Sequence, residues 1–135
     1  MKSFNNIQAE VPDVLSHYFT QCSIAMSCQQ LATSLLFLAN KGIDPNTRNN
    51  ICTARDAHRV NAILSTSGMY DQSGEFAFSV GLPAKSGVGG GVVAIVPGYG
   101  VICAWSPLLN TFGNSIVGTN LVAGLAEELG LSIYH

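Results

Sequence analysis

Charged residues are scarce in this 135-residue sequence. Six Lys and Arg and eight Asp and Glu make up 10% of the chain, against roughly 25% in an ordinary soluble domain. The net charge of −2 comes with no cluster of basic residues, which argues against nucleic acid or an anionic membrane as the main partner. Because 47% of the residues are hydrophobic, we expect part of the surface to contact other polypeptide chains.

Long hydrophobic runs are also missing. The most apolar stretch, "LATSLLFLAN" at 31–40, is interrupted by Thr33 and Ser34 and is far shorter than the ~20 residues that span a bilayer. It predicts a buried helix. The start, "MKSFNNIQAEVPD", has no apolar segment of the kind found in secretion signals, so we expect a cytoplasmic protein.

The cysteine and histidine residues form no recognisable ligand pattern. None of the four cysteines belongs to a C-x-x-C pair or has a histidine at metal-ligand spacing, so they are interpreted as packing residues, with a zinc site or a disulfide as the less favoured alternative. The histidines are interpreted as surface or packing residues. These residues are Cys22, Cys28, Cys52, Cys103, His17, His58 and His135.

Helical periodicity dominates the first half of the chain. It predicts helices over 12–22, 27–42 and 53–68, the second of them opened by a capping box in which Ser27 and Gln30 stand three residues apart. The apolar face of that second helix is formed by Leu31, Leu35 and Leu38.

Extended patterns follow. The stretches "FAFSV" (76–80), "GVVAIVP" (91–97) and "GVICAWS" (100–106) predict three antiparallel strands, with a tight hairpin at 98–100. A helix over 120–133 closes the chain and packs on the sheet. The order of these elements predicts an α+β fold with helices packed on an antiparallel sheet. The C-terminal helix has leucines one turn apart, Leu121, Leu125 and Leu129.

Glycines cluster after Lys85 and Ser86, in "GLPAKSGVGGGVVAIVP". A phosphate-binding P-loop places its Lys and Ser or Thr after the glycines and continues into a helix, whereas this chain continues into a predicted strand. The cluster is therefore interpreted as one side of a site, and a phosphate-binding module is a distant alternative. Gly87, Gly89, Gly90 and Gly91 would let the backbone come close to a ligand and to a packed helix, with a bulge or tight packing as the alternative for Gly90 and Gly91.

Three stretches resemble the C-terminal half of the serine-dependent glutaminases. They are "YFTQCSIAMSC", "SGMYDQSGEFAFSVGLPAKSGVGGGVVAIVP" and "WSPLLNTFGNSIVG", and they cover nearly the whole chain in family order. The resemblance implies a partial β-lactamase/transpeptidase-like fold, with residues 1–135 as the C-terminal portion of a glutaminase domain. It also implies hydrolysis of L-glutamine to L-glutamate and ammonia, no metal or organic cofactor, and a homo-oligomer.

The same resemblance assigns the site residues. It implies Tyr18 and Tyr70 as catalytic and substrate-binding tyrosines, and the backbone N–H of Val88 as an oxyanion-hole donor. The element Lys85-Ser86-Gly87 resembles the K-T-G strand of penicillin-recognising enzymes, which presents a cation and a hydroxyl to the substrate. These residues are expected to meet around one concave pocket. Ser115 lacks the surroundings of a nucleophile and is interpreted as structural.

The nucleophile element of that family is absent from the sequence. Members use a serine activated by a lysine in an S-x-x-K element, but Leu38 and Leu82 stand three residues before Lys41 and Lys85. Met1 is as compatible with an internal residue of a longer protein as with a true start. Two hypotheses remain: a glutaminase that needs a complementary N-terminal segment, or a catalytically inactive remnant or interaction subunit of the same fold.

Overall fold

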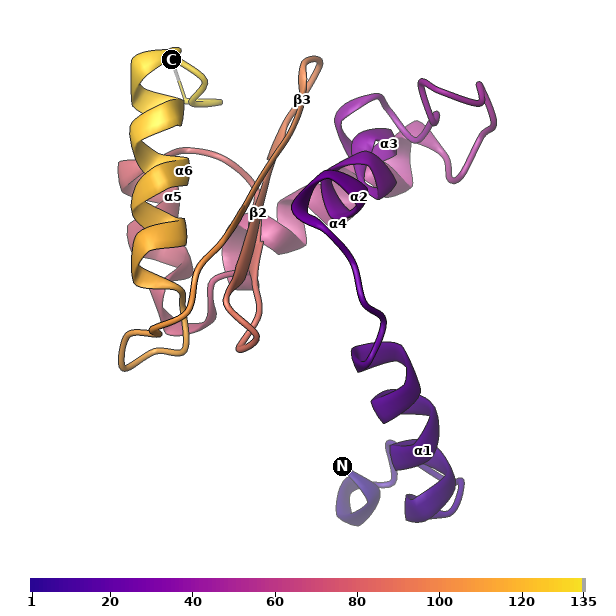
Figure 1. Ribbon diagram of the computed structural model, residues 1–135. Helices are drawn as coiled ribbons and strands as arrows, with labels where there is room; N and C mark the ends of the chain where they lie inside the picture. Colours follow the sequence, from indigo (N-terminus) through magenta and orange to yellow (C-terminus); the bar gives the residue numbers. More distant parts are fainter. Residues whose placement is uncertain (135) are drawn as a thin grey trace.

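The computed structural model describes residues 1–134, which form a three-stranded sheet between two groups of helices (Figure 1). His135, interpreted as a surface or packing residue, lies outside the described residues. The helices that come before the sheet are η1 (Lys2–Phe4), α1 (Val11–Cys22), α2 (Cys28–Ser34), α3 (Leu36–Ala39), α4 (Ala54–Ser67), η2 (Tyr70–Gln72) and α5 (Ser73–Ser79). They are followed by strands β1 (Ala84–Ser86), β2 (Gly91–Val96) and β3 (Gly100–Trp105) and by helix α6 (Ile116–Glu128). None of the helices among the described residues combines the length and hydrophobicity that crossing a bilayer requires.

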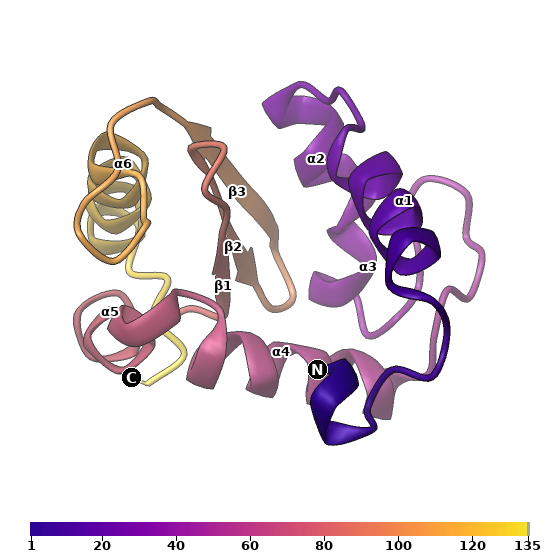
Figure 2. The ribbon, with the colours of Figure 1, turned by 90° about the horizontal axis from the view of Figure 1, so that it is seen from below.

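The sheet is antiparallel in the order β1-β2-β3, as predicted, with a tight turn at Pro97–Tyr99 between β2 and β3. The middle strand β2 is covered on both faces, which explains its unbroken apolar sequence. Helices α5 and α6 lie on one face and α2, α3 and α4 on the other (Figures 1 and 2). Val92, Ala94 and Val96 point toward the first group, and Ile95 packs against the second.

Helix starts agree with the predicted capping residues. The Ser27 Oγ accepts from the Gln30 N–H at 3.2 Å, while the Gln30 side chain accepts from the Ser27 N–H at 2.8 Å. Thr53 caps α4 by accepting from the N–H of Asp56. These reciprocal bonds satisfy helix-start N–H groups that would otherwise lack partners.

Two predictions for individual elements are wrong. The stretch 76–80 is not a strand: Phe76 lies on α5 and Val80 is the residue that caps its end, and both are buried while Phe78 between them is 94% exposed. The alternating F-A-F-S-V pattern therefore has a helical outcome, and the first strand is β1. The predicted helix over 27–42 is also interrupted at Leu35, whose N–H bonds the Ala32 carbonyl in a tight turn before α3 begins.

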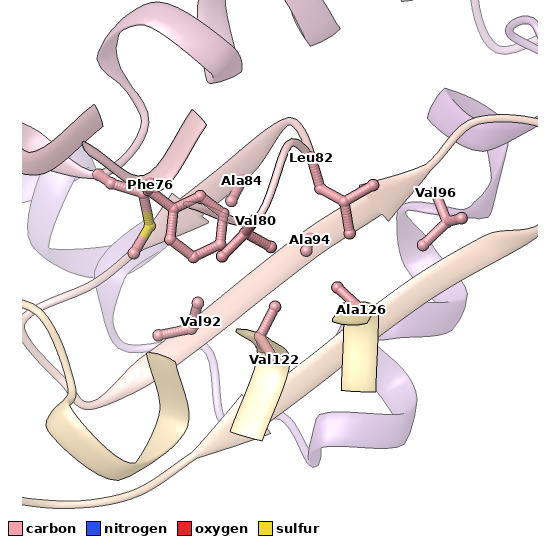
Figure 3. Packing of buried hydrophobic residues seen from close by; sticks show 10 residues of the cluster. Phe76, Val80, Leu82, Ala84, Val92, Ala94, Val96, Val122 and Ala126 are labelled. Atoms are coloured by element: carbon pink, nitrogen blue, oxygen red, sulfur yellow. The ribbon is translucent and has the colours of Figure 1, made fainter. Parts of the chain in front are cut away.

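Helix α6 packs on the sheet through a different face from its leucines. Val122 and Ala126 point into the core against Val92 and Ala94 (Figure 3), and Gly118 completes this buried face. The predicted leucines, Leu121, Leu125 and Leu129, are exposed instead. Small residues let the helix approach the sheet closely, and the larger side chains remain on the outer surface.

Candidate functional site

Tyr70, Lys85 and Val88 lie together at one end of the sheet. The Lys85 Nζ is 4.8 Å from the centre of the Tyr70 ring, a cation–π distance. Gly113 lies between Tyr70 and Val88: a Cβ built on Gly113 would be 3.6 Å from Tyr70 Cε2 and 3.7 Å from Val88 Cγ1. Three segments distant in sequence thus meet around the Tyr70 ring.

Tyr70 is held in a left-handed backbone conformation, with φ of +53°. For a residue with a Cβ this conformation costs on the order of 1–2 kcal/mol, and residues of this kind cluster at functional sites. The chain reverses here between α4 and α5, so the ring leaves the helix path and lies under Lys85.

On β1, the side chains of Lys85 and Ser86 point to opposite faces of the sheet. Lys85 is exposed, whereas Ser86 is only 2% exposed and its Oγ donates to Asn114 Oδ1 at 2.5 Å. Alternation along a strand explains this split, because neighbouring side chains point to opposite faces. Partial burial lowers the pKa of Lys85 from its usual 10.5, and its Nζ donates to the Ser86 carbonyl.

Val88 is at the tip of the glycine-rich loop that joins β1 to β2, and it is 71% exposed. Two hydrogen bonds hold this loop against the end of β3. Trp105 Nε1 donates to the Gly89 carbonyl at 2.7 Å, and the Ser106 N–H donates to the Gly90 carbonyl at 3.1 Å. Within residues 1–134 the Val88 N–H has no hydrogen-bond acceptor. Such an N–H, on an anchored loop, can donate to an oxygen of a bound molecule.

The glycines of this loop have different roles. Gly90 has φ of +97° and a Cβ there would be 2.5 Å from the Ser106 carbonyl oxygen, so tight packing requires it. A Cβ at Gly87, Gly89 or Gly91 would meet nothing within 4 Å. These three glycines leave open space beside Val88, where a ligand could approach the backbone.

Tyr18 belongs to α1, a helix that stands apart from the sheet (Figure 1). A hydrogen bond with the Cys22 thiol is the main reason that the pKa of Tyr18 lies above its usual 10.0, and the nearby Tyr70 hydroxyl adds to the effect. Tyr18 is 60% exposed, and its ring packs against that of Phe19, 6.0 Å away between centroids.

Asn114 is a residue that sequence reasoning missed as part of the site. It is fully buried and bonds both Ser86 and the backbone next to Tyr70. Its position in the G-N-S element was the available signal, but burial of a single polar residue is not visible in one sequence. Ser115, interpreted as structural, caps α6 by accepting from the Gly118 N–H at 3.1 Å.

Metal ligands do not gather in the described part of the chain: residues 1–134 contain no group of three His, Cys, Asp or Glu side chains that could hold an ion. All four cysteines are free thiols. The chemistry that the site residues offer is hydrogen bonding from phenols, an amine and a backbone N–H. These groups suit binding and polarisation of a carbonyl compound.

The mixed architecture, an antiparallel sheet with helices on both faces, matches part of a β-lactamase-like fold. The Bacillus subtilis glutaminase YbgJ, solved as a covalent complex with 5-oxo-L-norleucine, superposes with a TM-score of 0.93 at 35% identity, covering 98% of this chain and 48% of that one. The native form of Mglu gives a TM-score of 0.93 at 34% identity, covering 99% and 32%.

Sequence comparison extends this similarity over the whole described chain. The glutaminase family model matches residues 1–134, and the chain therefore belongs to the glutaminase family. Glutaminases from Aliarcobacter butzleri and Shewanella amazonensis are 53% and 48% identical to it over 134 residues, or 99% of this chain. The chain spans 44% of the length of each of these relatives.

Proposed function

We propose that residues 1–135 form the C-terminal portion of a glutaminase domain that hydrolyses L-glutamine to L-glutamate and ammonia. The observation that supports this most is the family match over 1–134 together with the grouping of Tyr70, Lys85 and Val88 at one end of the sheet. The bound norleucine derivative in the B. subtilis relative supports a glutamine-like substrate. We propose a cytoplasmic location for the protein.

In this proposal the chain supplies the binding and oxyanion side of the active site. The Val88 N–H stabilises the negative charge that develops on the substrate carbonyl oxygen, a contribution of about 3 kcal/mol. The Tyr18 and Tyr70 hydroxyls bind the substrate, and Lys85 adds positive charge beside Gly87. The Ser86 hydroxyl, occupied by Asn114, supports the strand from inside rather than contacting the substrate.

The nucleophile comes from elsewhere, because this sequence has no S-x-x-K element. We propose that the protein is a homo-oligomer, and that a complementary N-terminal segment, joined to this chain or separate from it, supplies the serine and lysine. The serine attacks the amide carbonyl, ammonia leaves, and water hydrolyses the glutamyl-serine ester. The exposed apolar face of α1, with Val11, Leu15 and Phe19 beside Tyr18, is the surface that this segment would cover.

The test is an ammonia-release assay with L-glutamine on the 135-residue chain, alone and mixed with a family segment that contains S-x-x-K. We expect no turnover alone, because one oxyanion donor lowers the barrier by only about two powers of ten while enzymes need at least ~10⁶-fold acceleration. We expect turnover from the mixture and its loss with Tyr70→Phe. A mixture that binds glutamine without releasing ammonia would favour the inactive-remnant hypothesis.

A further inference from the structure

The left-handed conformation of Tyr70 needs something to hold it. Its φ of +53° is unfavourable for a tyrosine, and such a residue keeps this conformation only where the surroundings fix it. The ring must also stay under the Lys85 amine, 4.8 Å away. The contacts of the backbone on either side of Tyr70 therefore determine the geometry of the site.

Some of these contacts are local. The Ser73 hydroxyl accepts from the Met69 N–H at 3.0 Å and donates to the Tyr70 carbonyl at 2.7 Å, bridging the turn. Next to it, the Gly68 carbonyl accepts from the Ser86 N–H at 3.1 Å, which joins the turn to β1. The Met69 carbonyl, which immediately precedes Tyr70, accepts from the Gln72 N–H at 3.1 Å within the same turn.

Asn114 is the second donor to the Met69 carbonyl and the one that comes from outside the turn. The Asn114 Nδ2 donates to this carbonyl at 3.1 Å and to Gln72 Oε1 at 2.8 Å, while its Oδ1 accepts from Ser86 Oγ at 2.5 Å. The amide orientation is unambiguous, because a carbonyl cannot donate and the Nδ2 group must face Met69. Asn114 is 0% exposed, so water cannot replace these bonds.

We propose that Asn114 is a positioning residue, which ties the left-handed turn at Tyr70 to the strand of Lys85 and so sets the tyrosine ring in the active site. The inference rests on the proposed function for its relevance to catalysis, but not for its geometry. The residue before Asn114 supports it, since a Cβ built on Gly113 would be 3.6 Å from the Tyr70 ring and 3.7 Å from the Val88 side chain. One loop thus fixes the Tyr70 backbone and borders its side chain.

The direct test follows Lys85 by NMR in the 135-residue chain labelled with ¹³C-lysine. The chain has only three lysines, Lys2, Lys41 and Lys85, and the ring current of Tyr70 displaces the Lys85 side-chain signals. Lys85→Arg assigns them, and Tyr70→Leu gives the position without the ring. Asn114→Asp keeps the shape of Asn114 but puts an oxygen against the Met69 carbonyl, so we expect it to remove most of that displacement.

Asn61→Asp is the matched control. The Asn61 Nδ2 also donates to a backbone carbonyl, that of Leu38, at 3.0 Å, but in α4 on the opposite face of the sheet. It should lower stability without moving the Lys85 signals, which separates positioning from a general loss of packing. If Asn114→Asp proves unfolded by circular dichroism, the smaller, uncharged Asn114→Ser replaces it with the same expectation.

The second readout is ammonia release in the presence of the S-x-x-K segment. Misplacing Tyr70 should lower kcat about 100-fold and raise KM, because its hydroxyl also binds the substrate, while Asn61→Asp should leave both unchanged. Unaltered Lys85 signals in a folded Asn114 variant would overturn the inference. If the Lys85 signals change in a folded Asn114 variant but turnover does not, the positioning role is supported and Tyr70 is excluded from the reaction. The two proposals therefore fail separately.

Discussion

The N-terminal arm, residues 1–26, and the body, residues 27–134, use their apolar residues in opposite ways. No residue of the arm is buried, although α1 places Val11, Leu15 and Phe19 on its surface. The body encloses a core on each side of β2. An isolated helix of 12 residues is marginal in water, so the complementary segment that we propose would stabilise the arm, whereas the body has core clusters of its own.

The site that we propose has residues in both regions. Tyr70, Lys85 and Val88 are positioned by buried contacts of the body, while Tyr18 belongs to the arm. The body residues are therefore preorganised in this chain alone, and the arm tyrosine depends on whatever covers α1. The difference suggests that a complementary segment would fix Tyr18 and bring the nucleophile in the same step.

A buried charge should have the largest effect. Val122 is fully buried between α6 and the sheet, so Val122→Asp should unfold the body, at a cost of several kcal/mol. Leu15→Asp, on the exposed face of α1, should change stability by less than about 0.5 kcal/mol. Urea unfolding followed by circular dichroism measures both, and equal losses would mean that the arm packs as tightly as the body.

The sequence predicted the parts of the body in which local signals and packing agree. The capping box at Ser27, the hairpin before Gly100 and the apolar run of β2 are decided within a few residues. The prediction failed at Phe76, where alternation suits a strand but burial at Phe76 and Val80 requires a helix. Only tertiary packing distinguishes these two outcomes.

The site was predicted only as far as the family resemblance reaches. Tyr70, Lys85 and Val88 stand in recognisable motifs and lie together in the structure. The inward orientation of Ser86 and the central position of Asn114 depend on a hydrogen bond between residues 28 positions apart. Nothing in the local sequence of either residue reveals such a partner.

A glycine substitution tests the close approach of α6 to the body. A Cβ at Gly118 would be 2.8 Å from Ser115 Oγ and 3.5 Å from Val92 Cγ2, so Gly118→Ala must displace the capping hydroxyl. We expect a loss of about 1–2 kcal/mol, since overpacking and the lost cap outweigh the helix propensity of alanine. Gly124→Ala, with nothing within 4 Å, should stabilise by about 1 kcal/mol. Thermal unfolding compares them, and a stabilising Gly118→Ala would contradict the packing of α6.

A smaller effect should appear in the pH dependence of the body. Burial, followed by a hydrogen bond with Cys28, raises the pKa of the Cys103 thiol from its usual 9.0 to about 11. Because the folded state holds this proton more tightly than the unfolded chain, the thiol contributes stability that is present below pH 9.0 and is lost as the pH rises through about 11. Denaturant titrations across this range should show a steeper decline for the wild type than for Cys103→Ala. The same slope in the wild type and Cys103→Ala would exclude this contribution.

The smallest effect is expected from removing the arm altogether. A chain that begins at Ser27 keeps the capping box of α2 and every residue of both core clusters, so its free energy of unfolding should stay within about 0.5 kcal/mol of the full chain. The same truncation should abolish ammonia release in the mixture with the S-x-x-K segment, because Tyr18 and the apolar face of α1 are gone. Calorimetry measures the change in stability, and the assay measures the loss of ammonia release. A large drop in stability would show that α1 belongs to the body, and full activity without the arm would exclude both Tyr18 and α1 from the completed site.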